Sequence, residues 1–109
     1  MKGAPEDGEE VMAMKASLLP EVEISQRLAA IPRWMEENSE IVRTFEFRDF
    51  VAGLAFVNKV GDLAESKGHH PDIDIRWNKV KLALTTHDAG GLTSKDFDLA
   101  AEIDQAAGA

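Results

Sequence analysis

The stretch DIDIRWNKVKLALTT, residues 72–86, decides the fold that this sequence predicts. Apolar side chains recur at every second position in each half of it, first Ile73, Ile75 and Trp77 and then Val80, Leu82 and Leu84. A period of two is typical of strands, because successive side chains point to opposite faces of a sheet. Only a short link around Asn78 separates the two runs, which favours a tight antiparallel hairpin.

A long helix is predicted before this hairpin. Asp49 is suited to cap its first turn, and Gly68 is suited to end it after Lys67. The apolar residues between them form two adjacent stripes, Phe50, Leu54, Val57 and Ala64 on one and Phe56, Val60 and Leu63 on the other. One stripe can cover a sheet, and the second would then pack on another helix, for instance from a second subunit. Alternatively, a single broad core face uses both stripes.

A second pair of strands precedes the long helix. Residues 34–36 predict a short strand, residues 37–40 a turn and residues 41–47 a longer strand. The longer run alternates between two faces, with Ile41, Phe45 and Phe47 on one and Val42, Thr44 and Glu46 on the other. This pattern indicates a strand with one buried face.

Helices are expected at both ends of this arrangement. Residues 20–31 carry apolar side chains at helical spacing, with Pro20 in the first turn and Pro32 ending the helix. The pattern TSKD at 93–96 is a capping box that opens a last helix, which runs to about Ala106. The order α-β-β-α-β-β-α predicts an α+β fold, a four-stranded antiparallel sheet with three helices packed on one face.

The length of 109 residues supports one small domain. We assign that domain to residues 19–109. Residues 1–18 mix Gly, Pro, Glu and Met without periodicity, and we expect them to form a mobile N-terminal extension with one frayed helical turn around residues 11–16.

The composition excludes several classes of protein. A formal net charge of −8, with 12 scattered Lys and Arg residues, argues against binding to nucleic acid. Cysteine is absent, which excludes disulfides and a cysteine nucleophile and fits a reducing cytoplasm. The sequence has no apolar run of about 18 residues and no apolar signal segment at its start. We therefore expect a cytoplasmic protein without a nucleic-acid or membrane partner.

The three histidines are the strongest candidates for chemistry. His69 and His70 are adjacent after the long helix, and His87 follows the hairpin. Imidazole titrates near neutral pH, so these residues can supply both an acid and a base. Glu65, four residues before His69, is close enough to orient a ring, or to raise its basicity, if the helical geometry persists. Pro71 restricts His70 to extended conformations, which aims the two rings in different directions.

Simpler interpretations of the same residues stay open at this point. The histidines can be exposed residues of an ordinary turn. Three histidines with nearby carboxylates also match zinc or iron ligands, but neither H-x-x-x-H nor H-x-H spacing occurs, so a metal site ranks below acid–base chemistry. The capping box alone explains Asp96, and Trp34 and Trp77 are more often core residues than stacking platforms.

Taken together, these residues resemble a known signature. The series Glu65, His69-His70-Pro71, Trp77, His87 and Asp96 is similar to the signature of the pterin-4-alpha-carbinolamine dehydratase family. The resemblance extends from about Leu19 to Ile103 and includes RTFEF at 43–47, HHPD at 69–72, THD at 86–88 and GLT at 91–93. Trp77 stands where tyrosine is common in the family.

The resemblance implies a reaction and an assembly. The reaction is the loss of water from 4a-hydroxytetrahydropterin to give quinonoid dihydropterin, a hydro-lyase step that supports tetrahydrobiopterin recycling for aromatic amino acid hydroxylases. The pterin is the substrate, and neither a metal nor an organic cofactor is required. The family fold also implies a homodimer formed by joining sheets, or a homotetramer formed through the long helix.

The resemblance further implies roles for single residues. The implied catalytic residues are His69, His70 and His87, of which we expect His69 and His87 to form the acid–base pair and His70 mainly to hold the pterin. The implied substrate-binding or orienting residues are Glu65, which would orient a histidine, Trp34 and Pro71, which would shape the pocket, and Trp77 and Asp96. The alternative is a non-catalytic protein on the same fold that binds or assembles a partner protein.

Overall fold

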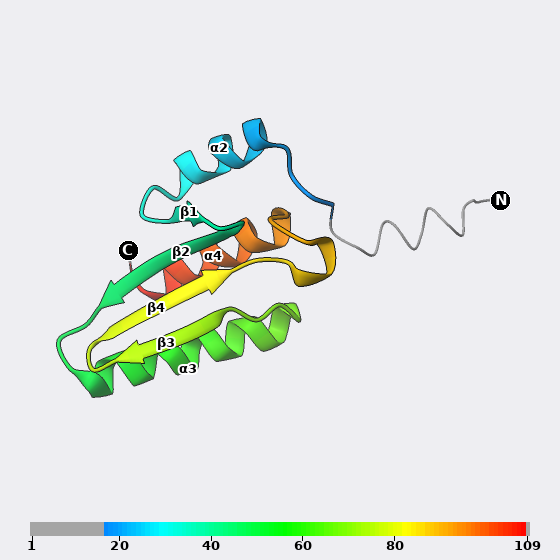
Figure 1. Ribbon diagram of the computed structural model, residues 1–109. Coiled ribbons are helices and arrows are strands. Elements are labelled where there is room, and N and C mark those ends of the chain that lie inside the picture. The colour runs from blue at the N-terminus through cyan, green and yellow to red at the C-terminus, as the bar shows by residue number, and fades with distance from the viewer. Residues whose placement is uncertain (1–16, 109) are drawn as a thin grey trace.

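The computed structural model describes residues 17–108, which form one antiparallel sheet covered by helices (Figure 1). The elements are α2 (Glu21–Ala30), β1 (Met35–Glu37), β2 (Glu40–Glu46), α3 (Phe50–Lys67), β3 (Asp72–Arg76), β4 (Lys79–Leu84), the 3₁₀ turn η1 (His87–Ala89) and α4 (Ser94–Ala106). The strand order is β1-β2-β4-β3. The predicted α+β fold and its order of elements are confirmed. Residues 1–16, which hold most of the predicted extension and its helical turn, lie outside the described part.

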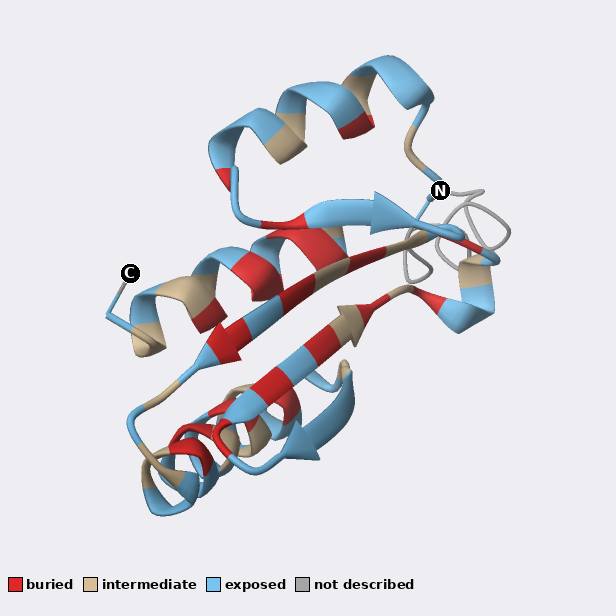
Figure 2. Cartoon of the chain, turned by 60° about the vertical axis from the view of Figure 1, so that its left-hand side comes forward, coloured by how far each residue is buried: buried red, intermediate tan, exposed pale blue. Residues whose placement is uncertain are grey.

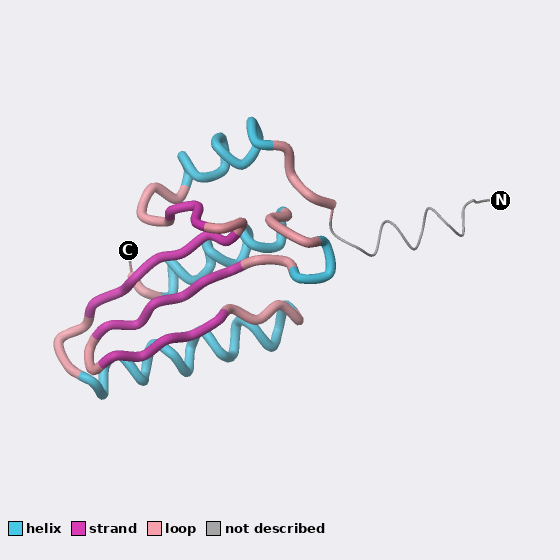
Figure 3. Tube along the Cα trace, viewed as in Figure 1, coloured by secondary structure: helices cyan, strands magenta, loops and turns pink. Residues whose placement is uncertain are grey.

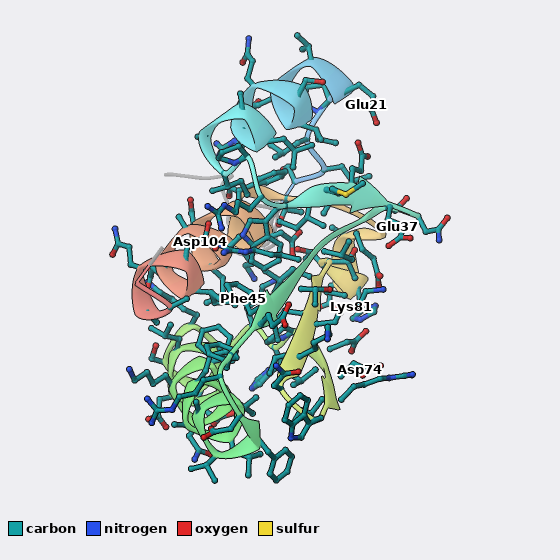
Figure 4. All side chains as sticks on the ribbon, turned by 90° about the vertical axis from the view of Figure 1, so that its left-hand side faces the viewer. Glu21, Glu37, Phe45, Asp74, Lys81 and Asp104 are labelled. Atoms are coloured by element: carbon teal, nitrogen blue, oxygen red, sulfur yellow. The ribbon has the colours of Figure 1, made fainter. Side chains whose placement is uncertain are left out.

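The core lies between the central strands and the helices. The register of β2 and β4 pairs Ile41 with Leu84 and Phe45 with Val80, and all four side chains are buried. Lys81 alternates with them on β4 and points away from the helices, as Figure 4 shows. Helices α3, α4 and α2 add apolar residues to the same core, among them Phe56, Val60, Phe97, Leu99, Ile103 and Ile24. The predicted buried face of each central strand is therefore confirmed.

The two edge strands, in contrast, are exposed along their whole length (Figure 2). On β3, Ile73 and Ile75 face the same side as the core but are covered by no outer strand. Trp77 was expected to continue their alternation, and this was wrong. It occupies the β3–β4 turn and is 66% exposed. Its φ of 52° belongs to the two-residue link of the hairpin and not to a strand, so its side chain does not continue the alternation of β3.

The long helix α3 begins and ends as predicted. The side chain of Asp49 accepts a hydrogen bond from the Ala52 amide at 2.8 Å. Gly68 ends the helix with a φ of 62°, a left-handed conformation that glycine adopts without a steric penalty. The next amide, that of His69, donates back to the Ala64 carbonyl, so the direction in which the chain leaves the helix is defined. Among the described helices, none has the length and apolarity to span a lipid bilayer.

An ion pair between a buried arginine and a half-buried aspartate joins β2 to α4. Arg43 lies on the inner face of β2, and its Nη1 donates to Asp104 Oδ1 at 2.6 Å. The indole N–H of Trp34 donates to the same oxygen at 2.9 Å. Arg43 also lies over the ring of Phe45, 4.0 Å from its centre, and Figure 4 shows Asp104 and Phe45 on the helix side of the sheet. The carboxylate of Asp104 therefore compensates the positive charge of Arg43, which the alternation of β2 places on the core side of the sheet.

Removing this carboxylate tests its structural role. Asp104→Ala leaves the Arg43 guanidinium buried without its counter-charge, so we expect the free energy of unfolding to fall by about 3 kcal/mol, measured by urea denaturation. Asp98 is a matched control on the same helix, because its side chain is 70% exposed. Asp98→Ala is expected to change the stability by less than about 0.5 kcal/mol. Equal losses in the two variants would contradict the assignment.

Candidate active site

Two loops meet at one end of the sheet. One connects α3 to β3 and carries His69, His70 and Pro71, and the other connects β4 to α4 and carries His87 (Figure 3). His69 of the first loop and Thr86 at the start of the second both form side-chain hydrogen bonds to Asp96, in the first turn of α4. The end of α3, the end of β4 and the start of α4 therefore assemble the candidate site.

The central contact of the site is between His69 and Asp96. His69 Nε2 lies 2.7 Å from Asp96 Oδ1, and the two side chains are 11% and 0% exposed. The other oxygen of Asp96, Oδ2, accepts the Thr93 amide at 2.9 Å and closes the predicted capping box. One carboxylate thus serves both interpretations that the sequence left open, with one oxygen capping the helix and the other binding a histidine.

His70 has a different carboxylate partner. Its Nε2 lies 2.6 Å from Glu65 Oε2, and both side chains are largely exposed. The two adjacent rings therefore bind separate carboxylates, as the restriction by Pro71 suggested. Glu65 therefore contacts His70 and not His69, which lies four residues after it, and its role in orienting a histidine stays a prediction. The left-handed turn at Gly68 breaks the helical spacing, so His69 reaches toward α4 and His70 lies beside the last turn of α3.

His87 begins the turn η1 and is exposed. The residue before it, Thr86, is buried, and its hydroxyl donates to Asp96 Oδ2 at 2.9 Å. Main-chain hydrogen bonds between Thr86 and Gly91 close the loop around His87. His87 is therefore connected to His69 through one residue and one shared carboxylate.

The two tryptophans are not part of this arrangement. Trp34 was expected to shape the pocket, but it is 3% exposed and binds Asp104, eight residues after Asp96 on α4. Eight helical residues span about 12 Å. Trp77 lies at the other end of β3 from Pro71, roughly 20 Å away at the rise of an extended strand. Within one chain, the site consists of the loop histidines, Pro71 and their carboxylates.

Two threonines, Thr86 and Thr93, belong to the site although neither was among the site residues that the sequence predicted. Thr86 Oγ1 and Thr93 Oγ1 lie 2.7 Å apart, both buried beside Asp96. A signal for Thr86 was present, because it continues the inward phase of Val80, Leu82 and Leu84 on β4. A hydroxyl at a buried position needs a hydrogen-bond partner, and only the tertiary structure identifies it.

An ion pair holds the two helices of the site together. Lys67 Nζ at the end of α3 lies 2.8 Å from Glu102 Oε2 on α4. The hydrogen bond to Glu102, and then its negative charge, raise the pKa of Lys67 above its usual value. Lys67 precedes Gly68 and His69 directly, so this contact helps keep His69 within reach of α4.

No metal-binding cluster of three or more His, Cys, Asp or Glu residues occurs in residues 17–108. The sequence-based expectation that the reaction needs no metal stays a prediction. The side chains gathered at the site are instead suited to moving protons, since imidazoles paired with carboxylates are common acid–base groups.

Comparison with known proteins agrees with this geometry. The family model "Pterin 4 alpha carbinolamine dehydratase" matches residues 17–106. A protein of Chloroflexus aurantiacus, named provisionally as a pterin-4-alpha-carbinolamine dehydratase, is 63% identical over 90 residues, which are 83% of this chain and 97% of that protein.

Two solved structures share the fold. A transcriptional coactivator/pterin dehydratase from Brucella melitensis is 31% identical with a TM-score of 0.79, and the match covers 82% of this chain and 97% of that one. A pterin dehydratase-like protein described as a RuBisCO assembly factor in the alpha-carboxysome is 24% identical with a TM-score of 0.59, over 71% of this chain and 89% of that one. The chain belongs to the pterin-4-alpha-carbinolamine dehydratase family.

Proposed function

We propose that this protein removes water from 4a-hydroxytetrahydropterin to give quinonoid dihydropterin. The observation that carries the proposal is the pair His69–Asp96, a histidine held at 2.7 Å by a fully buried carboxylate, next to the loop that presents His87. A third histidine, His70, lies beside it on the exposed side. Family membership supports the same reaction.

The chemistry suits groups that transfer protons. One group protonates the C4a hydroxyl, so that the C4a–O bond breaks and water leaves. A second group accepts the proton of N5, whose electron pair forms the C4a=N5 double bond. No electrons are gained or lost overall, and two poised imidazoles are sufficient. We therefore propose that neither a metal nor an organic cofactor takes part.

We assign His69 and His87 as the acid–base pair. His69 has a fixed orientation, because Asp96 holds one of its ring nitrogens. His87 lies on a separate loop and is open to solvent, so it can approach the pterin from another direction. His70, exposed and held by Glu65, is assigned to binding the pterin.

Single replacements test this division of roles. His69→Ala and His87→Ala are each expected to lower kcat for carbinolamine dehydration by roughly 10²- to 10⁴-fold, the usual contribution of a general acid or base. His70→Ala is expected to raise KM more than it lowers kcat. Undiminished turnover of His87→Ala would exclude it from the pair.

Elemental analysis of the active wild-type protein provides the control for cofactor-free chemistry. We expect full turnover by protein that contains no stoichiometric zinc or iron. Activity that rises in proportion to bound metal would contradict this part of the proposal.

We further propose that the chain forms a homodimer through β3. This strand is at the edge of the sheet, and it carries Ile73 and Ile75 in exposed positions. An exposed apolar edge strand is unfavourable alone, because its free backbone groups pair readily with another strand. A second copy of β3 would satisfy both the backbone and the isoleucines. Assembly of dimers into a tetramer would use the exposed apolar residues of α3.

A charge on the edge strand tests this assembly. Ile75→Lys is expected to shift the protein from dimer to monomer in size-exclusion chromatography with light scattering, since charged side chains on an edge oppose pairing. Thr44→Lys, an exposed position on the central strand β2, is the matched control and should leave the mass unchanged. A dimer that persists in Ile75→Lys would place the interface elsewhere.

The physiological setting that we propose is cytoplasmic recycling of a pterin cofactor for an aromatic amino acid hydroxylase. A second function, binding or assembly of a partner protein, is favoured by the exposed apolar residues Phe50, Val51 and Leu54 on α3. The structural relatives include a coactivator and an assembly factor. Affinity capture with a triple-His variant separates the two: a partner retained by this variant supports the binding role, and one that is lost with the histidines does not.

A further inference from the structure

We propose that Thr86 is a positioning residue that, through Asp96, holds His69 with its Nδ1 toward the substrate. The inference rests on the proposed function only for its effect on turnover. It starts from a chain of hydrogen bonds, in which Thr93 Oγ1 lies 2.7 Å from Thr86 Oγ1, Thr86 Oγ1 lies 2.9 Å from Asp96 Oδ2, and Asp96 Oδ1 lies 2.7 Å from His69 Nε2.

The direction of each bond follows from counting protons. The Thr86 hydroxyl donates its one proton to Asp96 Oδ2. Its oxygen can therefore only accept in the contact with Thr93, so the Thr93 hydroxyl donates. Thr93 Oγ1 in turn accepts the Lys95 amide at 3.2 Å. The Lys95 amide and the hydroxyls of Thr93 and Thr86 are therefore all hydrogen-bonded in one arrangement, in which each group donates in the direction of the Asp96 carboxylate.

The same count identifies the tautomer of His69. Asp96 Oδ2 already accepts two donors, the Thr86 hydroxyl and the Thr93 amide. A carboxylate only accepts hydrogen bonds. Oδ1 must then accept a hydrogen bond from His69, so Nε2 carries the hydrogen and Nδ1 keeps its lone pair. Nδ1 is thus the nitrogen of His69 that can exchange a proton with the pterin.

Thr86 also positions the second histidine. Its amide donates to the Gly91 carbonyl at 3.0 Å, and its own carbonyl accepts from the amides of Ala89, Gly90 and Gly91. These bonds shape the loop that begins with His87. One residue therefore joins the orientation of His69, through its side chain, to the placement of His87, through its main chain.

Nitrogen-15 NMR of the free protein tests the tautomer without any turnover. In long-range proton–nitrogen spectra, we expect His69 of the wild-type protein to show a protonated Nε2 and an unprotonated Nδ1 in its neutral form. A His69 that is protonated at Nδ1 instead would overturn the proposal, whatever the variants do.

Two replacements then isolate the hydroxyl. Thr86→Val keeps the branched shape but has no donor, and Thr86→Ser keeps the donor. We expect the Nε2 proton of His69 to exchange with solvent at least about tenfold faster in Thr86→Val, because Asp96 loses one of the bonds that hold it, and at the wild-type rate in Thr86→Ser. Thr85→Val removes a neighbouring hydroxyl that, within residues 17–108, donates to the Ser39 carbonyl and not to Asp96, and it should leave the exchange unchanged. Unaltered exchange in a folded Thr86→Val protein would overturn the role of Thr86.

Steady-state kinetics of the same variants test whether Thr86 affects the proposed reaction. In Thr86→Val, kcat for dehydration should fall by roughly tenfold or more, as is usual when a residue that supports a reacting group through a hydrogen bond is lost. KM should stay nearly constant. Thr86→Ser should restore kcat. If the wild-type protein lacks dehydratase activity, the proposed reaction fails but the NMR result still decides the tautomer. If turnover is present and Thr86→Val matches the wild type, the positioning role fails alone.

Discussion

The carboxylate of Asp96 is the group on which the candidate site depends. It is fully buried, and a buried charge is costly unless hydrogen bonds compensate it. The compensation comes from three parts of the chain: the N-cap of α4, the segment just after β4 and the loop after α3. The bonds that satisfy this charge are therefore the same bonds that bring the two histidine-bearing loops together.

Helix α4 serves the fold and the site from its two ends. Asp96 in its first turn binds His69, and Asp104 in its last turn compensates Arg43 and accepts the Trp34 indole. Between them, Glu102 holds Lys67 at the end of α3. The contacts at the far end of α4 keep the helix against the sheet, and this packing keeps Asp96 at a fixed distance from the loops. Stability and site geometry are thus coupled through a single rigid element.

Two surfaces of the described chain remain available for association, the outer edge of β3 and the exposed stripe of α3. Neither surface uses the histidines, which lie in the loops at the end of the sheet. Association through either surface, as proposed above, would therefore leave the arrangement around Asp96 unaltered. This separation explains how one architecture can be compatible with both a dehydratase and a partner-binding protein.

The order of elements, the helix caps and the inward faces of the central strands follow from the sequence, because alternation, helical spacing and residues such as Asp49 and Gly68 act over a few positions. The pairing of His69 with Asp96 joins positions 27 residues apart, and no local pattern specifies such a contact. The spacing of Glu65 and the two adjacent histidines did not specify which ring this carboxylate contacts, since the left-handed turn at Gly68 changes where the next side chains point. The sequence by itself therefore determined which groups the site could contain. Only the packing of α4 against the end of α3 decided which carboxylate holds which histidine, because a hydrogen bond depends on the final position of both atoms.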